Sequence, residues 1–256
     1  MFSITDDGPI RWLTIDNVAR RNAIPGDQWS ALGDRLQEFE DSRQRALVII
    51  GAGEDFCSGA DLGAGFDLGS GPGGVHAAMR RVARAARALH ESTKPTVAAV
   101  DGAAVGAGMN LALGCDVVIA TTRARFSEIF VRRGLTVDFG GTWLLPRRIG
   151  LARAKELALT GRMVVGEEAL RYGLAAEVVE PADLRKRAAE VAAELAAAAP
   201  RAQLFTKVGL ERAFEMSFDE ALEYEGQAQA LCSATEDVIE GVRAFLEKRP
   251  PDFQGR

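Results

Sequence analysis

The sequence predicts an α/β body followed by a region built from helices alone. Short runs at residues 46–50, 96–100 and 115–120 have the length and the apolar, mostly β-branched composition of buried strands. Stretches with helical periodicity lie between them, and beyond residue 180 only helical patterns recur. Residues 46–50 are apolar throughout, which is typical of a strand in a sheet that is covered on both faces.

The N-terminal elements are a strand pair and a helix. Residues 10–15 alternate in part between apolar and polar side chains and predict a strand, with residues 3–5 as its partner across the turn at 7–9. Asp27 is suited to cap a helix that runs to about Asp41. One face of this helix carries Trp29, Leu32, Leu36 and Phe39, so it should face the core.

A glycine-rich connection precedes an arginine-rich helix. Residues 63–74 hold too many glycines to keep a packed conformation on their own, so we expect either a mobile loop over a site or a disordered surface insertion. Residues 75–92 follow as a helix. One broad face of it carries Arg80, Arg81, Arg84 and Arg87. That face is either solvated or a landing place for phosphate.

The central stretch, residues 101–141, carries the signals of chemistry. Gly106 and Gly108 open a short buried helix, and a second glycine-rich passage at 134–141 holds a single acid, Asp138. Turns of this kind leave backbone N–H groups free to stabilise an oxyanion, and one carboxyl can move a proton. Glycines that serve only close packing are the alternative.

The remaining elements are mostly helical. Residues 151–160 and 166–172 predict helices, and residues 176–180 predict the last strand. Pro181 begins an alanine-rich helix that ends near Ala199. Further helices are expected at about 201–213, 218–233 and 235–247.

This change of pattern divides the chain in two. Residues 1–199 are predicted to form the α/β body with the active site, and residues 200–256 a helical region that packs against another subunit. A chain of 256 residues with 47% hydrophobic and 26% charged residues can bury a core of this size.

Bulk properties argue against several classes of partner. The net charge of −5 gives no reason to expect nucleic acid or an anionic membrane as a ligand. The N-terminus lacks the features of a secretory signal, and no stretch reaches the roughly 18 apolar residues of a membrane span. Cys57, Cys115 and Cys232 fit neither a disulfide framework nor a metal site, so a reducing cytoplasm is the expected location.

Six short motifs follow one another along the chain with a characteristic order and spacing. They are Asn22-Ala23, Phe56-Cys-Ser-Gly-Ala-Asp-Leu62, Gly102-Ala-Ala-Val-Gly-Ala-Gly108, Cys115-Asp116, Gly140-Gly141 and Phe245-Leu-Glu-Lys-Arg249. In this register the whole chain resembles the crotonase superfamily, the enoyl-CoA hydratase/isomerase group. Residues 134–147 and 245–255 look most like the branch that isomerises the ring-epoxide form of phenylacetyl-CoA and shifts double bonds in enoyl-CoA substrates.

The resemblance implies a crotonase-like spiral of ββα repeats with a C-terminal helical region, assembled as a homotrimer or homohexamer. It implies an acyl-CoA thioester as substrate, with no metal and no cofactor beyond the CoA moiety. The shared chemistry is enolate formation, in which two backbone N–H groups stabilise the thioester oxygen. By position these groups belong to Ala60 and Ala107, and Gly59 and Gly106 shape the backbone around them.

The two glutamates that hydratases of the family use are missing from this chain. Asn110 and Phe130 stand in their positions, and the resemblance puts both in the substrate pocket. Neither side chain can take a proton. Glu128 lies two residues before Phe130, and on a helix this spacing directs it to another face.

Asp138 is the remaining acid, at the position where acid-bearing isomerases of the family place theirs. Val137, Phe139 and Gly140 flank it, so burial should raise its pKa toward neutrality. One carboxyl in an apolar pocket suits a base that lifts a proton from one carbon and returns it to another. With Phe130 excluding water, the sequence predicts an isomerase.

Three alternatives stay open. A water activated by Asp138 and held by Asn110 would make the protein an enoyl-CoA hydratase. A non-catalytic CoA-binding homologue is the second alternative, and Asp138 would then only form a turn. A dehalogenase of the family uses an aspartate here as a nucleophile, but it needs a tryptophan where Phe130 stands. His76 and His90 are expected on the surface, without the partners of a catalytic triad.

The resemblance also assigns contacts with CoA. Four of them lie in the N-terminal part of the chain, at Arg21, Ala23, Asp61 and Leu62. The first two would meet the phosphates and pantetheine, and the last two the adenine. Phe245 and Lys248 match a C-terminal pair that reaches the nucleotide, often from a neighbouring subunit. For Lys248, a cation that only ends a helix is the alternative.

Overall fold

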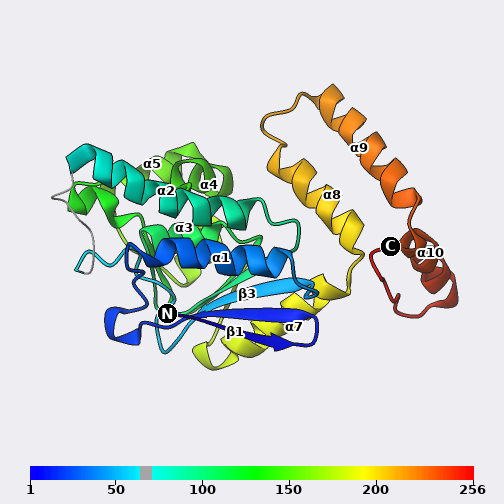
Figure 1. The fold of residues 1–256 in the computed structure, drawn as a ribbon, viewed down its shortest axis with the longest axis horizontal. Helices are drawn as coiled ribbons and strands as arrows, with labels where there is room; N and C mark the ends of the chain where they lie inside the picture. Colours follow the sequence, from blue (N-terminus) through cyan, green and yellow to red (C-terminus); the bar gives the residue numbers. More distant parts are fainter. Residues whose placement is uncertain (64–70) are drawn as a thin grey trace.

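Parallel strands form the centre of the larger of two sheets (Figure 1). The structure is a computed structural model that describes residues 1–63 and 71–256. Within these residues the larger sheet contains, in spatial order, β1 (Phe2–Asp7), β2 (Ile10–Ile15), β3 (Ala46–Gly51), β4 (Thr96–Val100), β6 (Val117–Thr121) and β9 (Glu177–Val179). β1 runs antiparallel to β2, and the other neighbours are parallel. The predicted N-terminal strand pair is therefore confirmed.

A smaller sheet repeats the order of the larger one. It consists of β5 (Ala103–Val105), β7 (Arg125–Ser127) and β8 (Val164–Val165), and an isolated bridge adds Cys57 beside Ala104. Two successive turns of the chain, β4 with β5 and β6 with β7, each supply a strand to both sheets before the next α-helix, which agrees with the expected ββα spiral. Strands of two or three residues carry no periodicity that a sequence pattern could reveal.

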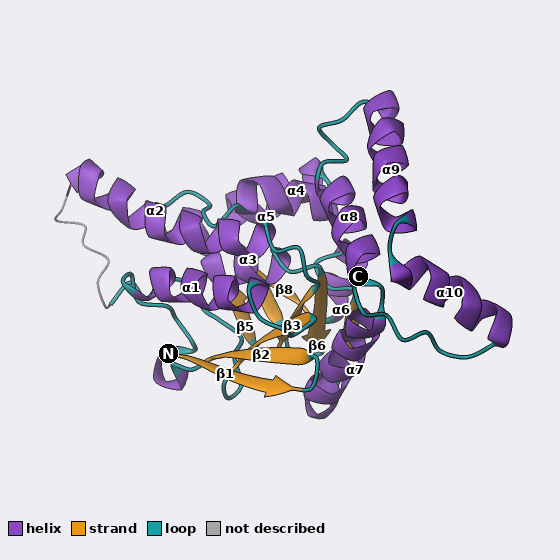
Figure 2. Cartoon of the chain, turned by 45° about the vertical axis from the view of Figure 1, so that its right-hand side comes forward, coloured by secondary structure: helices purple, strands orange, loops and turns teal. Residues whose placement is uncertain are grey.

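Helices cover both faces of the larger sheet. They are α1 (Gln28–Glu40), α2 (Gly71–His90), α3 (Ala107–Leu113), α4 (Gly141–Ile149), α5 (Leu151–Thr160), α6 (Glu167–Tyr172) and α7 (Leu184–Ala197), with 3-10 turns η1 (Val18–Arg20), η3 (Ile129–Arg133) and η4 (Pro181–Asp183). Buried side chains of α1, α2 and α3 form one core on the sheet, and α7 forms a second core on its other face (Figure 2). The two-sided burial predicted from residues 46–50 is confirmed.

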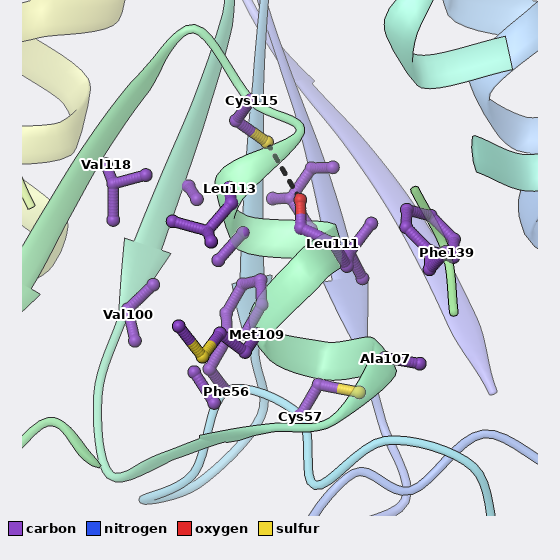
Figure 3. Packing of buried hydrophobic residues seen from close by; sticks show 14 of the residues in the cluster. Phe56, Cys57, Val100, Ala107, Met109, Leu111, Leu113, Cys115, Val118 and Phe139 are labelled. Atoms are coloured by element: carbon purple, nitrogen blue, oxygen red, sulfur yellow. Dashed lines mark hydrogen bonds between the residues drawn. The ribbon is translucent and has the colours of Figure 1, made fainter. Parts of the chain in front are cut away.

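Helix α3 is the most enclosed helix, and it fixes the centre of the body. All of its residues are buried, and Met109, Leu111 and Leu113 lie among side chains of the surrounding strands (Figure 3). A Cβ atom on Gly108 would lie 2.1 Å from the carbonyl oxygen of Cys57, so the helix presses backbone to backbone on the segment 56–62. This close approach brings the two glycine-bearing motifs together.

The last three helices leave the body. They are α8 (Pro200–Glu211), α9 (Phe218–Ser233) and α10 (Glu236–Glu247), and α9 and α10 extend away from the α/β part (Figure 1). Lys207 of α8 ties this region to the body by donating to Asp116 Oδ2 at 2.9 Å and to the carbonyl of Lys94 at 3.1 Å. The described elements after β9 are all helical, as the pattern predicts, whereas the division at residue 200 and its role in assembly stay predictions.

Three local expectations need correction or comment. The arginine-rich helix begins at Gly71 rather than at Val75, so part of the glycine-rich connection is helical, while residues 64–70 lie outside the described residues. Asp27 precedes α1 but makes no side-chain cap bond, because its own backbone is already helical, with φ −78° and ψ −22°. None of the described helices is long and apolar enough to cross a membrane.

Candidate active site

A cavity of about 920 Å³ opens between α2, the segment 56–62, the N-terminus of α3 and the segment between η3 and α4. Its wall includes most of the predicted site residues, namely Arg21, Ala23, Ala60, Asp61, Leu62, Ala107, Phe130 and Asp138. These come from five separate parts of the chain. The structure therefore brings together residues that the sequence connects only through the family resemblance.

Two backbone N–H groups are available on the wall of this cavity. Ala60 forms a parallel bridge with Ile24, but the bridge bonds use the carbonyl of Gly59 and the amide of Asp61, at 2.8 and 2.9 Å. Ala107 is the first residue of α3, where an N–H group has no intrahelical acceptor. Among the described residues, neither amide donates a hydrogen bond.

Gly59 places these two amides close to each other. Its φ is 92°, and a Cβ atom on it would lie 3.4 Å from the amide nitrogen of Ala107 and 2.7 Å from the carbonyl of Val105. Only glycine fits here. A side chain would strain the backbone at this positive φ, and it would clash with the carbonyl of Val105. Two unpaired donors on one wall are the arrangement that stabilises an oxyanion.

Asp138 places a carboxyl on the wall of the cavity, which Asp61 also lines. Within the described residues, its Oδ1 atom is buried and has no hydrogen-bond partner, and burial raises its pKa to about 7. The following Phe139 and Gly140 have φ of 50° and 80°, and this turn holds the Asp138 side chain at the wall. The raised pKa predicted from the apolar neighbours is confirmed, and the carboxyl can both accept and return a proton near neutral pH.

Asn110 and Phe130 differ in how they relate to the cavity. Phe130 lines it, as expected, with its ring beside Gly106. Asn110 does not line it, which corrects the expectation, because α3 turns this fully buried side chain away behind Asp138. There its Nδ2 atom donates to the main-chain carbonyl of Asp138 at 3.0 Å. Asn110 thus stabilises the Asp138 turn from the side that faces away from the cavity.

Glu128 does not line the cavity, as the sequence reasoning expected, but it lies against Asn110 rather than apart from the site residues. It precedes η3 with φ −82° and ψ 64°, so the helical spacing used to turn it away from the site does not apply. The side chain is fully buried, and Asn110 Nδ2 donates to its Oε2 at 3.3 Å. Burial, and secondarily the charge of Asp138, raise its pKa to about 8 against the lowering effect of the Asn110 bond. It lies behind the cavity wall.

Arginines gather on the wall of the otherwise apolar cavity. They are Arg20, Arg21, Arg87, Arg125 and Arg133. Arg21 is 4.0 Å from Asp55 and Arg20 is 3.9 Å from Asp61, so these two ion pairs are long, whereas Arg125 pairs with Asp55 at 3.2 Å. An apolar hollow with cations on its wall suits a ligand with an apolar end and an anionic end.

The arginine face of α2 divides between two roles. Arg87 lines the cavity, while Arg84 pairs with Asp34 and Arg81 donates to the carbonyl of Gly26 at 3.1 Å. Sequence reasoning missed the cavity arginines Arg125 and Arg133, since no local pattern shows that their strand and 3-10 turn face the same hollow.

Phe245 and Lys248 stand apart from the cavity of their own chain. Both belong to the end of α10, which lies beside α9 and away from α2 and α3 (Figure 1). The side chain of Phe245 is 82% exposed. Their predicted contact with CoA stays a prediction that requires a second copy of the chain.

The spiral of ββα units, with an apolar cavity, a cationic wall and two unpaired amides, defines a protein of the crotonase fold class. The sequence profile of the enoyl-CoA hydratase/isomerase family matches residues 7–256. The chain belongs to this family of enzymes.

Relatives and solved structures carry both kinds of name. A short-chain-enoyl-CoA hydratase of Clostridium acetobutylicum is 35% identical, with 95% of this chain and 93% of that protein covered. A 1,2-epoxyphenylacetyl-CoA isomerase of Escherichia coli is 37% identical, with 95% and 94% covered. The crystal structure of an enoyl-CoA hydratase from Bacillus anthracis superposes with a TM-score of 0.94 at 30% identity, covering 100% of this chain and 99% of that one.

Proposed function

We propose that this protein is an acyl-CoA isomerase that moves a proton, and with it a double bond, along an enoyl-CoA thioester. The observation that carries the proposal is the Asp138 carboxyl, which lines the cavity, lacks a hydrogen-bond partner at Oδ1 among the described residues and has its pKa raised to about 7. Such a group is a base with the strength that reversible proton transfer requires.

In the proposed reaction, the Asp138 carboxylate removes a proton from the α carbon of a β,γ-unsaturated thioester. The electron pair of the broken C–H bond moves into the thioester and gives a dienolate, whose oxygen accepts hydrogen bonds from Ala60 and Ala107. Asp138 then returns the proton to the γ carbon, and the conjugated α,β-enoyl thioester forms. The two amides supply ~3–4 kcal/mol each to the transition state by analogy with other oxyanion holes, and the base contributes ~10²–10⁴ in rate.

The second candidate is hydration of an enoyl-CoA, which the name of the Clostridium relative favours. Hydration needs polar groups that hold a water inside the cavity. Asn110 and Glu128, the polar side chains behind Asp138, do not line the described cavity, and Phe130 does. These positions favour isomerisation over hydration.

The arginines of the cavity would bind the CoA phosphates, with Asp61 and Leu62 beside the adenine. We also propose that the protein works as a homotrimer or homohexamer. Exposed apolar side chains on the last helices, such as Phe218, Ile239 and Phe245, would be covered by a second copy. Phe245 and Lys248 would then reach the cavity of that copy.

Two thioesters separate the candidate reactions. Conversion of 3-hexenoyl-CoA to the 2-enoyl isomer raises the absorbance of the conjugated thioester, whereas hydration of crotonyl-CoA lowers it. We expect the first reaction to be fast and the second slow. The ring-epoxide form of phenylacetyl-CoA is a further substrate to test, because the Escherichia coli relative is named for it. Rapid hydration of crotonyl-CoA with no isomerisation would make the protein a hydratase.

Replacement of the base tests the role of Asp138. We expect Asp138→Asn to lower kcat for isomerisation at least ~10²-fold while acyl-CoA binding, measured by calorimetry, changes little. Asp7→Asn, an exposed acid of β1, serves as the matched control and should have wild-type rates. Full activity of Asp138→Asn would place the base elsewhere, and binding without turnover by the wild type would indicate a non-catalytic homologue.

A further inference from the structure

We propose that Glu128 is a positioning residue that works in its protonated form, as the second member of a buried carboxyl pair that shares one proton with Asp138. The inference rests on the proposed role of Asp138 as the base. Glu128 does not line the cavity and therefore would not touch the substrate. It would act through Asn110 and through its proximity to Asp138.

Hydrogen bonds connect the Asn110 side chain to the Glu128 side chain and to the main chain of Asp138. The Nδ2 atom of Asn110 donates both to Oε2 of Glu128, at 3.3 Å, and to the main-chain carbonyl of Asp138, at 3.0 Å. Gly141 fixes the amide from the other side, because a Cβ atom there would lie 2.3 Å from the same Nδ2. Asn110 is therefore held in one orientation, and Glu128 is the acceptor that keeps its donor directed at the Asp138 turn.

The balance of donors and acceptors indicates that Glu128 carries a proton. Within the described residues, three buried oxygens of this cluster have no hydrogen-bond partner: Asn110 Oδ1, Glu128 Oε1 and Asp138 Oδ1. An ionised Glu128 would add a buried carboxylate that only one amide supports, and such a group is costly. A protonated Glu128 adds one O–H donor to a cluster that lacks donors.

The charges around Glu128 point the same way. From α3 it faces the neutral Asn110, and from the turn before α4 it faces Asp138, whose negative charge disfavours a second carboxylate. The arginines of its own 3-10 turn, Arg132 and Arg133, are exposed, and Arg132 donates to the carbonyl of Thr160. Because both residues meet Asn110 and the charge of Asp138 acts on Glu128, the two carboxyls would titrate in two steps and hold one proton between them.

The singly protonated pair is the state suited to the proposed reaction. Asp138 is then ionised and able to accept a proton, and Glu128 is neutral. Loss of the second proton would leave Glu128 ionised while Asp138 holds the proton taken from the substrate. The charge of Glu128 would then repel the oxyanion that develops in the cavity and oppose enolate formation. We therefore expect the activity to fall at high pH because of Glu128.

Direct titration tests the pair without reference to turnover. In protein labelled with ¹³C at glutamate carboxyls, the signal missing from Glu128→Gln identifies Glu128. We expect it to titrate with a midpoint near 8 and to shift to lower pH in Asp138→Asn. A Glu128 midpoint in the ordinary range of glutamate would overturn the proposal even if the isomerase function is correct. A midpoint that is the same in the wild type and in Asp138→Asn would do so too.

The pH profile of kcat/KM for isomerisation tests the positioning role. The wild type should lose about tenfold in activity one pH unit above the upper midpoint. Glu128→Gln should keep the rise near pH 7 and lose the fall, since glutamine mimics the protonated acid and cannot ionise. An unchanged fall in Glu128→Gln contradicts the proposal, and so does inactivity of the folded variant at every pH. Absence of isomerisation by the wild type would instead refute the proposed function, and the titration would still decide on the pair.

Discussion

Burial decides what the charged residues of this cavity can do. An aspartate in water has a pKa well below 7, so it is ionised at neutral pH and is a weak base. At the apolar wall, burial raises the pKa of Asp138 to about 7, so that its two protonation states are close in free energy at neutral pH. The arginines of the cavity are exposed to solvent, and their positive charges are available to bind an anionic ligand. The site thus combines a buried carboxyl that can carry a proton with exposed arginines that carry positive charge.

At the same scale, Arg21 offers a test of CoA binding. We expect Arg21→Gln to raise KM for acyl-CoA about tenfold, the equivalent of ~1.4 kcal/mol, because one charge-assisted contact with phosphate is lost. The value of kcat should hardly change, since Arg21 lies far from the reacting carbons in the proposed complex. Steady-state kinetics would measure both constants.

Arg84 provides the matched control. It is an exposed arginine that pairs with Asp34 and does not line the cavity, so Arg84→Gln should leave KM unchanged. Equal effects of the two substitutions would indicate a general loss of positive charge, and no effect of Arg21→Gln would remove this residue from the CoA site.

Glu128 shows where residue-level prediction from sequence ends. A helical spacing separated it from the site residues, but Glu128 is itself non-helical where the chain enters η3, and its buried side chain meets Asn110. By contrast, the apolar neighbours of Asp138 predict its burial and raised pKa by themselves, although its place in the site comes from the family resemblance.

Among the elements, helix α3 and the segment 56–62 depend on each other. Each carries one of the unpaired amides, and their backbones meet where Gly108 faces Cys57. Long elements were predictable, because α1, α5 and α7 to α10 have periodic patterns of sufficient length. The short strands of the smaller sheet were not, because their pairing comes from the spiral rather than from their own residues.

Substitution of Gly108 tests this contact between α3 and the segment 56–62. We expect Gly108→Ala to destabilise the protein by ~3 kcal/mol or more, since the new Cβ would lie 2.1 Å from the Cys57 carbonyl oxygen and either the helix or the segment 56–62 must move. Activity should fall as well, because the movement separates the two amides. Thermal unfolding and the isomerase rate would measure the two effects.

The control for this change lies in α9. Gly226 is also helical and has open space around its Cα, so Gly226→Ala should stabilise the protein by up to ~1 kcal/mol through helix propensity. If Gly108→Ala were equally harmless, the close approach of helix and segment would not be what holds the amides together.

For the whole molecule, the net charge is a poor guide to the ligand. The chain carries a formal charge of −5, yet five arginines meet at one cavity. The local field at this wall is therefore positive while the average field is negative, which suits an anionic small molecule better than an extended polyanion. Figure 1 shows α9 and α10 at the end of the molecule opposite α2, so within one chain the helices proposed for assembly lie apart from the cavity wall that α2 forms.

Stability of the whole molecule should depend on pH through the buried pair. The pKa of Glu128 rises from 4.5 to about 8 on folding, so the folded state binds its proton more tightly. This contribution is fully present below pH 4.5, declines as the pH rises and is lost above pH 8, with a slope of ~1.4 kcal/mol per pH unit in between. We expect wild-type stability in urea, relative to that of Glu128→Gln, to fall along this slope between pH 5 and 7.5. Parallel stability curves for the two proteins would mean that Glu128 is ionised in the folded state, because only a group whose protonation changes on unfolding can make the difference between them depend on pH.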